Sequence, residues 1–182
     1  MIKAPPRIFL LGLRGTGKST IAPLLAERLA WNWCDMDAEL ERRAGQSVRE
    51  MFARLGESGF RQRESDLLRE ICSLEQVVVA TGGGIVLKEE NRRMLRQTGT
   101  CIWLRASLPV LVARLHNDPR SATLRPALTD LPLAEEMALL LTERAPLYQS
   151  CAHLVVDTDT LAPTAIADLI CQRLMPTSAR IS

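Results

Sequence analysis

The 182-residue sequence lacks most features that mark membrane, secreted or nucleic-acid-binding proteins. No apolar run approaches about 18 residues, so we expect no membrane span. Residues 1–13 hold a Pro-Pro pair and only a short apolar run, and therefore lack the anatomy of a signal peptide. The net charge is only +2, and no run of Lys and Arg with interleaved aromatic residues occurs. We therefore expect a cytoplasmic protein with small anionic partners, and no nucleic-acid or membrane partner.

Metal-binding and disulfide patterns are also missing. The five cysteines are widely spaced without a Cys-x-x-Cys pair, and there are only two histidines. This pattern indicates neither a zinc site nor a disulfide framework. Cys34 and Cys101 lie in strand-like apolar runs, and we expect them to be small buried side chains in a reducing compartment.

What the sequence does contain is an alternation of strand and helix patterns. A composition of 47% hydrophobic and 24% charged residues is typical of a globular protein, and we expect a single domain over residues 1–182. Strands are expected at residues 7–11, 31–34, 76–80, 100–104 and 153–156. Helices are expected at 19–30, 38–74 with breaks near 45 and 56–59, 88–97, 109–116, 133–149 and 163–174. The alternation predicts an α/β fold with a parallel sheet covered on both faces.

Residues 12–20, GLRGTGKST, match the phosphate-binding pattern Gly-x4-Gly-Lys-Ser/Thr between an expected strand and an expected helix. Glycines let the backbone curl until N–H groups point at an anion, and the helix start adds partial positive charge. We expect Lys18 to reach the outer phosphates and Ser19 to ligate Mg²⁺. The alternative is a chance glycine turn. The expected nucleotide contacts in this loop are Gly15, Thr16, Gly17, Lys18, Ser19 and Thr20.

Asp35 and Asp37 follow the second expected strand, near the sheet edge where open α/β proteins bind ligands. Alternation along an extended chain predicts that both carboxylates lie on one side. One could hold a water of the Mg²⁺ shell, while the other accepts a proton from an attacking hydroxyl. The alternative is a cap for the helix expected from Ala38.

Several other positions are candidates for ligand contact. Arg61 follows a glycine-rich turn, and it or Arg144 could clamp a carboxylate through two parallel hydrogen bonds; solvated arginines are the alternative. Three glycines at 82–84 come directly after a buried strand, which indicates a close approach or a tight turn. Residues 117–132 are interpreted as a mobile loop, from which Arg120 and Arg125 could swing onto transferring phosphates.

Together these segments resemble the shikimate kinase family, small P-loop enzymes that phosphorylate shikimate with ATP. The resemblance runs almost end to end, and the matching segments are residues 12–20, 35–37, 56–61 with Glu64, 82–84, 124–126 and 143–148. It implies a three-layer α/β/α fold of the P-loop NTP hydrolase type, with a five-stranded parallel sheet in the order 2-3-1-4-5. It also implies a substrate-binding helical region at about 37–74, a lid at about 117–132, and a monomer.

The resemblance further implies roles for the candidate residues. Shikimate is expected to contact Asp37, Arg61, Gly82, Gly83, Gly84 and Arg144, with the two arginines on its carboxylate and Asp37 on its hydroxyls. Asp35 is expected to organise the Mg²⁺ shell, and the residues expected to act in catalysis are Lys18, Asp37 and Arg125. The loop at 156–163 lacks the arginine that relatives often carry near adenine. We expect Pro163 to hold the adenine there, with Arg114 or Arg120 stacked on its other face.

The expected reaction transfers the γ-phosphate of ATP to the 3-hydroxyl of shikimate, with Mg²⁺ as cofactor, in aromatic amino acid biosynthesis. One alternative is a gluconate-type sugar-acid kinase, which the Phe60-Arg61, triple-glycine and Arg144 set disfavours. Another is a nucleotide-binding regulatory module without catalysis, which the intact Lys18 and Ser19 disfavour.

Overall fold

The computed structural model describes residues 7–118 and 131–174 of the chain. Its strands form one parallel sheet in the order β2-β3-β1-β4-β5, which confirms the predicted topology. The strands are β1 Arg7–Leu11, β2 Asn32–Asp35, β3 Val77–Ala80, β4 Thr100–Arg105 and β5 Leu154–Asp157. Because all of them run in the same direction, their carboxyl ends meet at one edge, and the loops that follow them can share one site.

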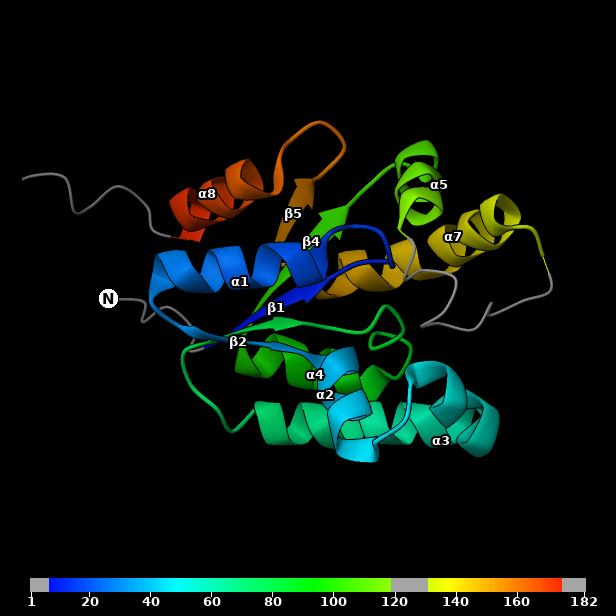
Figure 1. The fold of residues 1–182 in the computed structure, drawn as a ribbon. Coiled ribbons are helices and arrows are strands. Elements are labelled where there is room, and N and C mark those ends of the chain that lie inside the picture. The colour runs from blue at the N-terminus through cyan, green and yellow to red at the C-terminus, as the bar shows by residue number, and fades with distance from the viewer. Residues whose placement is uncertain (1–6, 119–130, 175–182) are drawn as a thin grey trace, which may run out of the picture.

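Helices cover both faces of this sheet (Figure 1). They are α1 Lys18–Leu29, α2 Met36–Ala44, α3 Val48–Ile71, α4 Glu89–Thr98, α5 Leu108–Asn117, α7 Leu133–Cys151 and α8 Pro163–Leu174. Helices α1 and α8 pack on one face, whereas α3, α4, α5 and α7 contribute to the core on the other face. The result is the predicted three-layer α/β/α arrangement.

Strand β1 shows how the sequence builds these two cores. Ile8 and Leu10 belong to the cluster under α1 and α8, and Phe9 and Leu11 belong to the opposite cluster. Successive side chains of a strand point to opposite faces, so a strand covered on both sides must be apolar at every position. The continuous apolar run that suggested this strand is therefore explained by its central place in the sheet.

The region between β2 and β3 has the breaks that the sequence predicted. Gly45 ends α2 in the left-handed conformation, with φ 63°. Ser47 and Glu50 form the capping box that starts α3, since the Ser47 hydroxyl accepts from the Glu50 N–H and the Glu50 carboxylate accepts from the Ser47 N–H. Gly56, with φ 68° and ψ 175°, then interrupts the helical conformation of α3 at a single residue. Two helical segments therefore meet at an angle inside α3.

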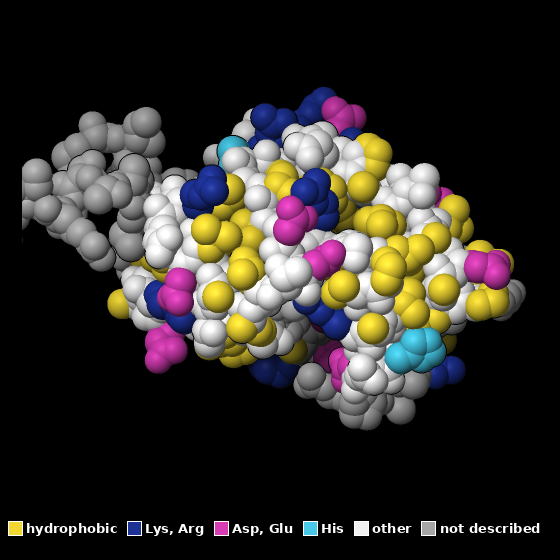
Figure 2. Space-filling model, turned by 90° about the horizontal axis from the view of Figure 1, so that it is seen from above, with side chains coloured by type: hydrophobic (Ala, Val, Ile, Leu, Met, Phe, Trp, Pro, Cys, Tyr) yellow, Lys and Arg dark blue, Asp and Glu magenta, His cyan; other side chains and the backbone are white. Residues whose placement is uncertain are grey.

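No helix within 7–118 or 131–174 is long and apolar enough to cross a membrane. On the face drawn in Figure 2, acidic and basic side chains are interspersed, and neither sign gathers into one patch. Burial raises the pKa of the Cys34 thiol to about 11 and that of Cys101 to about 12. Both thiols are therefore protonated at neutral pH and are poor nucleophiles. Cys101 is buried as predicted, whereas Cys34, on the edge strand β2, is only partly buried.

Candidate active site

The phosphate loop is the tightly curled segment that connects β1 to α1. Gly12, Gly15 and Gly17 all have positive φ, and a Cβ on Gly12 would lie only 2.5 Å from the carbonyl oxygen of Leu104. The buried Lys18 ammonium donates to the carbonyls of Gly12 and Leu13, at 2.8 Å each. The Lys18 ammonium is therefore held against the loop backbone. Its positive charge and the N-terminus of α1 both favour an anion there.

Ser19 and Asp35 lie together beside this loop. The Ser19 hydroxyl donates to Oδ2 of Asp35, while Oδ1 of Asp35 accepts from the N–H groups of Asp37 and Ala38 at 3.0 and 3.2 Å. Asp35 therefore caps α2 with one oxygen and faces Ser19 with the other, so the cap and the ligand site predicted from the sequence are compatible. A hydroxyl and a carboxylate are the hard oxygen donors that suit Mg²⁺, which otherwise keeps waters and substrate phosphates as ligands.

Asp35 and Asp37 both line the cleft beside the phosphate loop, but the extended backbone assumed for Asp37 was wrong. Helix α2 begins at Met36, directly after β2, so Asp37 lies in the first helical turn and not on an extended chain. Strand alternation therefore does not set the direction of its carboxylate. Asp37 lines both hollows described next, and its Oδ1 lies 3.2 Å from the Cβ position of Gly82.

Two adjoining hollows open at the carboxyl edge of the sheet. The first, the phosphate-loop cleft, is lined by residues that include Gly15, Gly17, Lys18, Ser19, Thr20, Asp35, Asp37 and Arg114. The second, the arginine pocket, is lined by residues that include Arg14, Asp37, Phe52, Phe60, Arg61, Glu64, Gly82, Gly83, Gly84 and Arg144. All six residues predicted to contact shikimate therefore line one pocket, and Asp37 lies at its border with the cleft.

Arg61 and Arg144 are buried in this pocket, with exposed fractions of 8% and 6%, and are not solvated surface arginines. The Nε atoms of both have no hydrogen-bond partner. The Arg61 guanidinium lies 5.5 Å from the ring centroids of Phe52 and Phe60, and its Nη1 donates to the buried Glu64. Unpaired buried N–H groups are costly, which makes this pocket a favourable place for a carboxylate with two acceptor oxygens.

The triple glycine makes room for the ion pair between Arg61 and Glu64. A Cβ on Gly82 would lie 2.3 Å from Oε1 of Glu64, and a Cβ on Gly84 would lie 2.3 Å from Cζ of Arg61. Neither glycine has a positive φ, so small size and not backbone freedom is what these positions require. Burial raises the pKa of Glu64, against the opposing charge of Arg61. The close approach predicted from the sequence is therefore made by side chains of α3.

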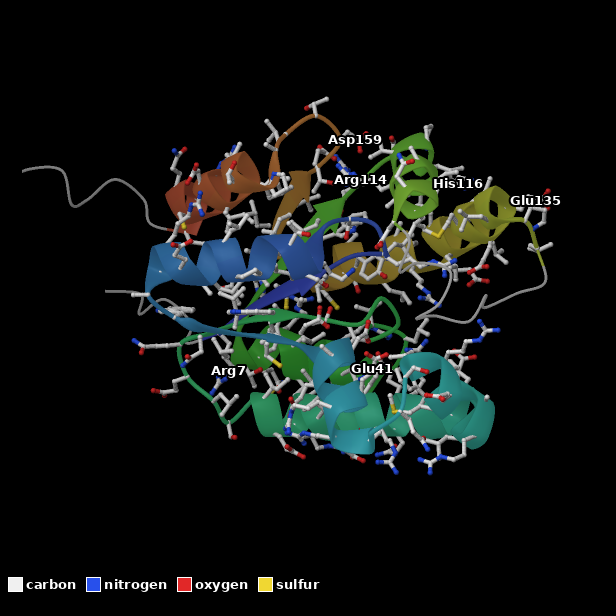
Figure 3. The ribbon with its side chains drawn as sticks, in the orientation of Figure 1. Arg7, Glu41, Arg114, His116, Glu135 and Asp159 are labelled. Carbon is white, nitrogen blue, oxygen red and sulfur yellow. The ribbon has the colours of Figure 1, made fainter. Side chains whose placement is uncertain are left out.

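Not all of the other residues predicted to contact the nucleotide line the phosphate-loop cleft. Arg114 donates to the carbonyl of Gly15 at 3.2 Å and to the hydroxyl of Thr158 at 3.0 Å, and points from α5 toward the loop after β5 (Figure 3). Thr16 is buried, and its hydroxyl donates to the Leu13 carbonyl at 2.8 Å. Pro163 begins α8 and is not among the residues that line the cleft. Arg120 and Arg125 lie outside the described residues.

Some residues of the site were missed by sequence reasoning. Arg14 occupies a variable position of the phosphate-binding pattern, which gives it no role, yet it lines both hollows and pairs with Glu136 of α7. Tyr148 is buried and donates to the carbonyl of Gly83. Both contacts join segments more than sixty residues apart in sequence, so no local pattern reports them.

Comparisons with known proteins point to one family. The family model described as "Shikimate kinase" matches residues 14–175. The shikimate kinase of Nitratidesulfovibrio vulgaris is 44% identical over 163 residues, covering 90% of this chain and 93% of that protein. That of Rhodopirellula baltica is 44% identical over 154 residues, covering 85% and 82%.

Solved structures of shikimate kinases are also similar to this chain. Shikimate kinase from Acinetobacter baumannii in complex with shikimate superposes with a TM-score of 0.89 at 33% identity, with 96% of each chain covered. A gluconokinase from Sinorhizobium meliloti reaches 0.58 at 17% identity, with 94% of this chain and 93% of that one covered, which shows a shared fold alone. The chain belongs to the shikimate kinase family.

Proposed function

We propose that this protein is a shikimate kinase that transfers the γ-phosphate of ATP to the 3-hydroxyl of shikimate. The products are shikimate 3-phosphate and ADP. The reaction is a step of aromatic amino acid biosynthesis. The observation that carries the proposal is a pair of buried arginines, Arg61 and Arg144, in a pocket that adjoins the phosphate loop. Their Nε groups make no hydrogen bond in the protein. A substrate with a carboxylate at one end and a hydroxyl at the other fits both hollows at once.

The arginine pocket binds the acceptor. Arg61 and Arg144 hold the carboxylate, since planar guanidinium groups match its two oxygens. Glycines 82–84 leave bare backbone beside the ring of the substrate. Asp37, at the border between the hollows, orients the reacting hydroxyl toward the cleft and accepts its proton.

The phosphate-loop cleft binds the donor. Lys18 contacts the outer phosphates in place of its present carbonyl partners, and the loop N–H groups surround the phosphates. Ser19 and Asp35 hold Mg²⁺ directly or through water; this ion, when bound, offsets the negative charge of the phosphates. Arg114 and Pro163 are assigned to adenine, and Arg120 and Arg125 to the phosphates.

Coupled assays of ADP release with a panel of acceptors test this proposal. We expect turnover with shikimate, and little with gluconate. Turnover with gluconate but not with shikimate would identify a sugar-acid kinase instead. Calorimetry that detects binding of ATP and shikimate, together with no ADP release, would identify a regulatory module without catalysis. We also propose that the protein acts as a cytoplasmic monomer without nucleic-acid or membrane partners.

A further inference from the structure

A buried ion pair connects the phosphate loop to the first turn of α7. Nη2 of Arg14 lies 2.6 Å from Oε1 of Glu136, and Nε of Arg14 donates to the Met137 sulfur at 3.4 Å. The Arg14 side chain is 12% exposed and that of Glu136 is 2% exposed. Such pairs add little net stability, because desolvation offsets the attraction, but separating the partners leaves a buried charge. The pair therefore restrains α7 relative to the loop.

One partner of the pair, Arg14, lies where the two hollows meet. Arg14 lines the phosphate-loop cleft and also the arginine pocket. Helix α7 carries Glu136 in its first turn, Arg144 in the arginine pocket, and Tyr148, which donates to the carbonyl of Gly83. One helix thus joins the phosphate loop, the expected carboxylate clamp and the triple glycine.

We propose that the Arg14–Glu136 pair is a positioning element, which sets the distance and direction between the bound phosphates and the acceptor. This role rests on the proposed function. Each half of the site keeps its own ligand groups without the pair, namely Lys18 in the cleft and Arg61 and Arg144 in the pocket. Loss of the pair lets α7 shift against the loop, and a displacement of about 1 Å can cost on the order of 100-fold in rate. The pair acts on the transfer step and not on the binding of either substrate alone.

Three variants of the full chain test this role: Arg14→Met, Glu136→Gln and the double variant. We expect each to lower kcat by about tenfold or more, with the double variant no worse than the poorer single variant because the two side chains act as a unit. The dissociation constants of ADP alone and shikimate alone, measured by calorimetry, should stay within about threefold of the wild type. Binding stoichiometry corrects kcat for any unfolded fraction, and the double variant removes both buried charges together.

The matched control is Arg28→Met, which breaks the pair between the partly exposed Arg28 of α1 and the exposed Asp168 of α8, away from both hollows. Its kcat should stay within about twofold of the wild type, since exposed ion pairs contribute little. An unchanged kcat in all three test variants, or a loss of ADP or shikimate affinity as large as the loss of kcat, would overturn the positioning role. A wild type that does not turn over shikimate would overturn the proposed function instead, so the two failures are distinguishable.

Discussion

Two arginines define the chemistry of this site at the scale of single residues. A solvated arginine gains little from binding an anion, since water already satisfies its donors. Arg61 and Arg144 are different because burial has removed water, and their Nε groups make no hydrogen bond. The Nε of Arg61 lies only 3.5 Å from the exposed Glu57 carboxylate. A ligand carboxylate would satisfy these donors without further desolvation of the protein, and we therefore expect the pocket to favour an acid over a neutral polyol.

Replacing Arg144 by alanine should raise the shikimate KM by about 30-fold or more, because a hydrogen bond to a charged group contributes about 2 to 3 kcal/mol. The KM for ATP should change by less than about threefold, since Arg144 does not line the phosphate-loop cleft. Arg93→Ala is the control, because Arg93 is an exposed residue of α4 paired with Glu89. If the ATP KM rose and the shikimate KM did not, Arg144 would have been assigned to the wrong substrate.

Gly84→Ala tests the same clamp without removing a charge. The added Cβ would lie 2.3 to 2.4 Å from the guanidinium of Arg61, which Glu64 and two aromatic rings restrain, so the guanidinium must move. We expect a roughly tenfold weaker shikimate affinity by calorimetry, at an unchanged ADP affinity. Equal shikimate affinities in the variant and the wild type would show that the position of Arg61 is not critical.

At the scale of elements, the sequence predicted most helices and strands but not how their side chains meet. The glycines at 45 and 56 and the capping box at Ser47 are local signals, and each of them marked a real boundary. The start of α2 at Met36 was not visible, because Asp35 can end a strand and cap a helix at the same time. Strand alternation therefore assumed the wrong backbone conformation for Asp37, although Asp35 and Asp37 do line the same cleft. The contact between Arg14 and Glu136 depends on tertiary structure alone.

The break in α3 should matter for the acceptor as well as for stability. Gly56 separates the segment that carries Phe52 from the segment that carries Phe60 and Arg61. No atom lies within 4 Å of its Cβ position, so Gly56→Ala introduces backbone strain without a clash. We expect a loss of about 1 to 2 kcal/mol in the free energy of unfolding and weaker shikimate binding, because the two segments reorient.

Gly45→Ala is the matched control for this variant. Gly45 has a similar φ of 63°, also has no neighbour at its Cβ position, and is not among the pocket residues. Its replacement should cost about 1 kcal/mol by urea denaturation, which is no more than at Gly56, because ψ 22° places Gly45 in the left-handed helical region. It should leave shikimate affinity unchanged. If both variants lost shikimate affinity equally, the effect would reflect general destabilisation and not the break in α3.

Helix α2 should make a small contribution to acid stability. Hydrogen bonds from Arg42 and Arg43 lower the pKa of Glu39 from 4.5 to about 2. A carboxyl whose pKa is lower in the folded state stabilises the fold above pH 4.5, and this stabilisation is lost as the pH falls toward 2. Because these pairs are exposed, we expect less than about 1 kcal/mol.

Urea denaturation at about pH 5 and about pH 3 tests this contribution. The wild type should lose more stability between the two pH values than Glu39→Gln does, since the variant has no carboxyl to protonate at that position. Equal losses would mean that the arginine contacts of Glu39 do not persist in solution.

At the scale of the whole molecule, the parallel sheet is what assembles the site. It brings the phosphate loop after β1, Asp35 at the end of β2 and the glycines after β3 to one edge, although they are far apart in sequence. Motif spacing was sufficient to predict this gathering, because parallel strands with helical crossovers leave few arrangements. The contacts of Arg114 were harder to predict, because it joins Gly15 to Thr158 through backbone groups that carry no sequence signal.

The most direct test of the account is a crystal structure of the protein with ADP and shikimate bound. We predict electron density for shikimate in the arginine pocket, with its carboxylate against Arg61 and Arg144. Its 3-hydroxyl should lie beside Asp37 and face the phosphate-loop cleft, with the phosphates of ADP around Lys18. Density that places shikimate elsewhere, or that turns its carboxylate toward Lys18, would contradict the assignment of the two hollows.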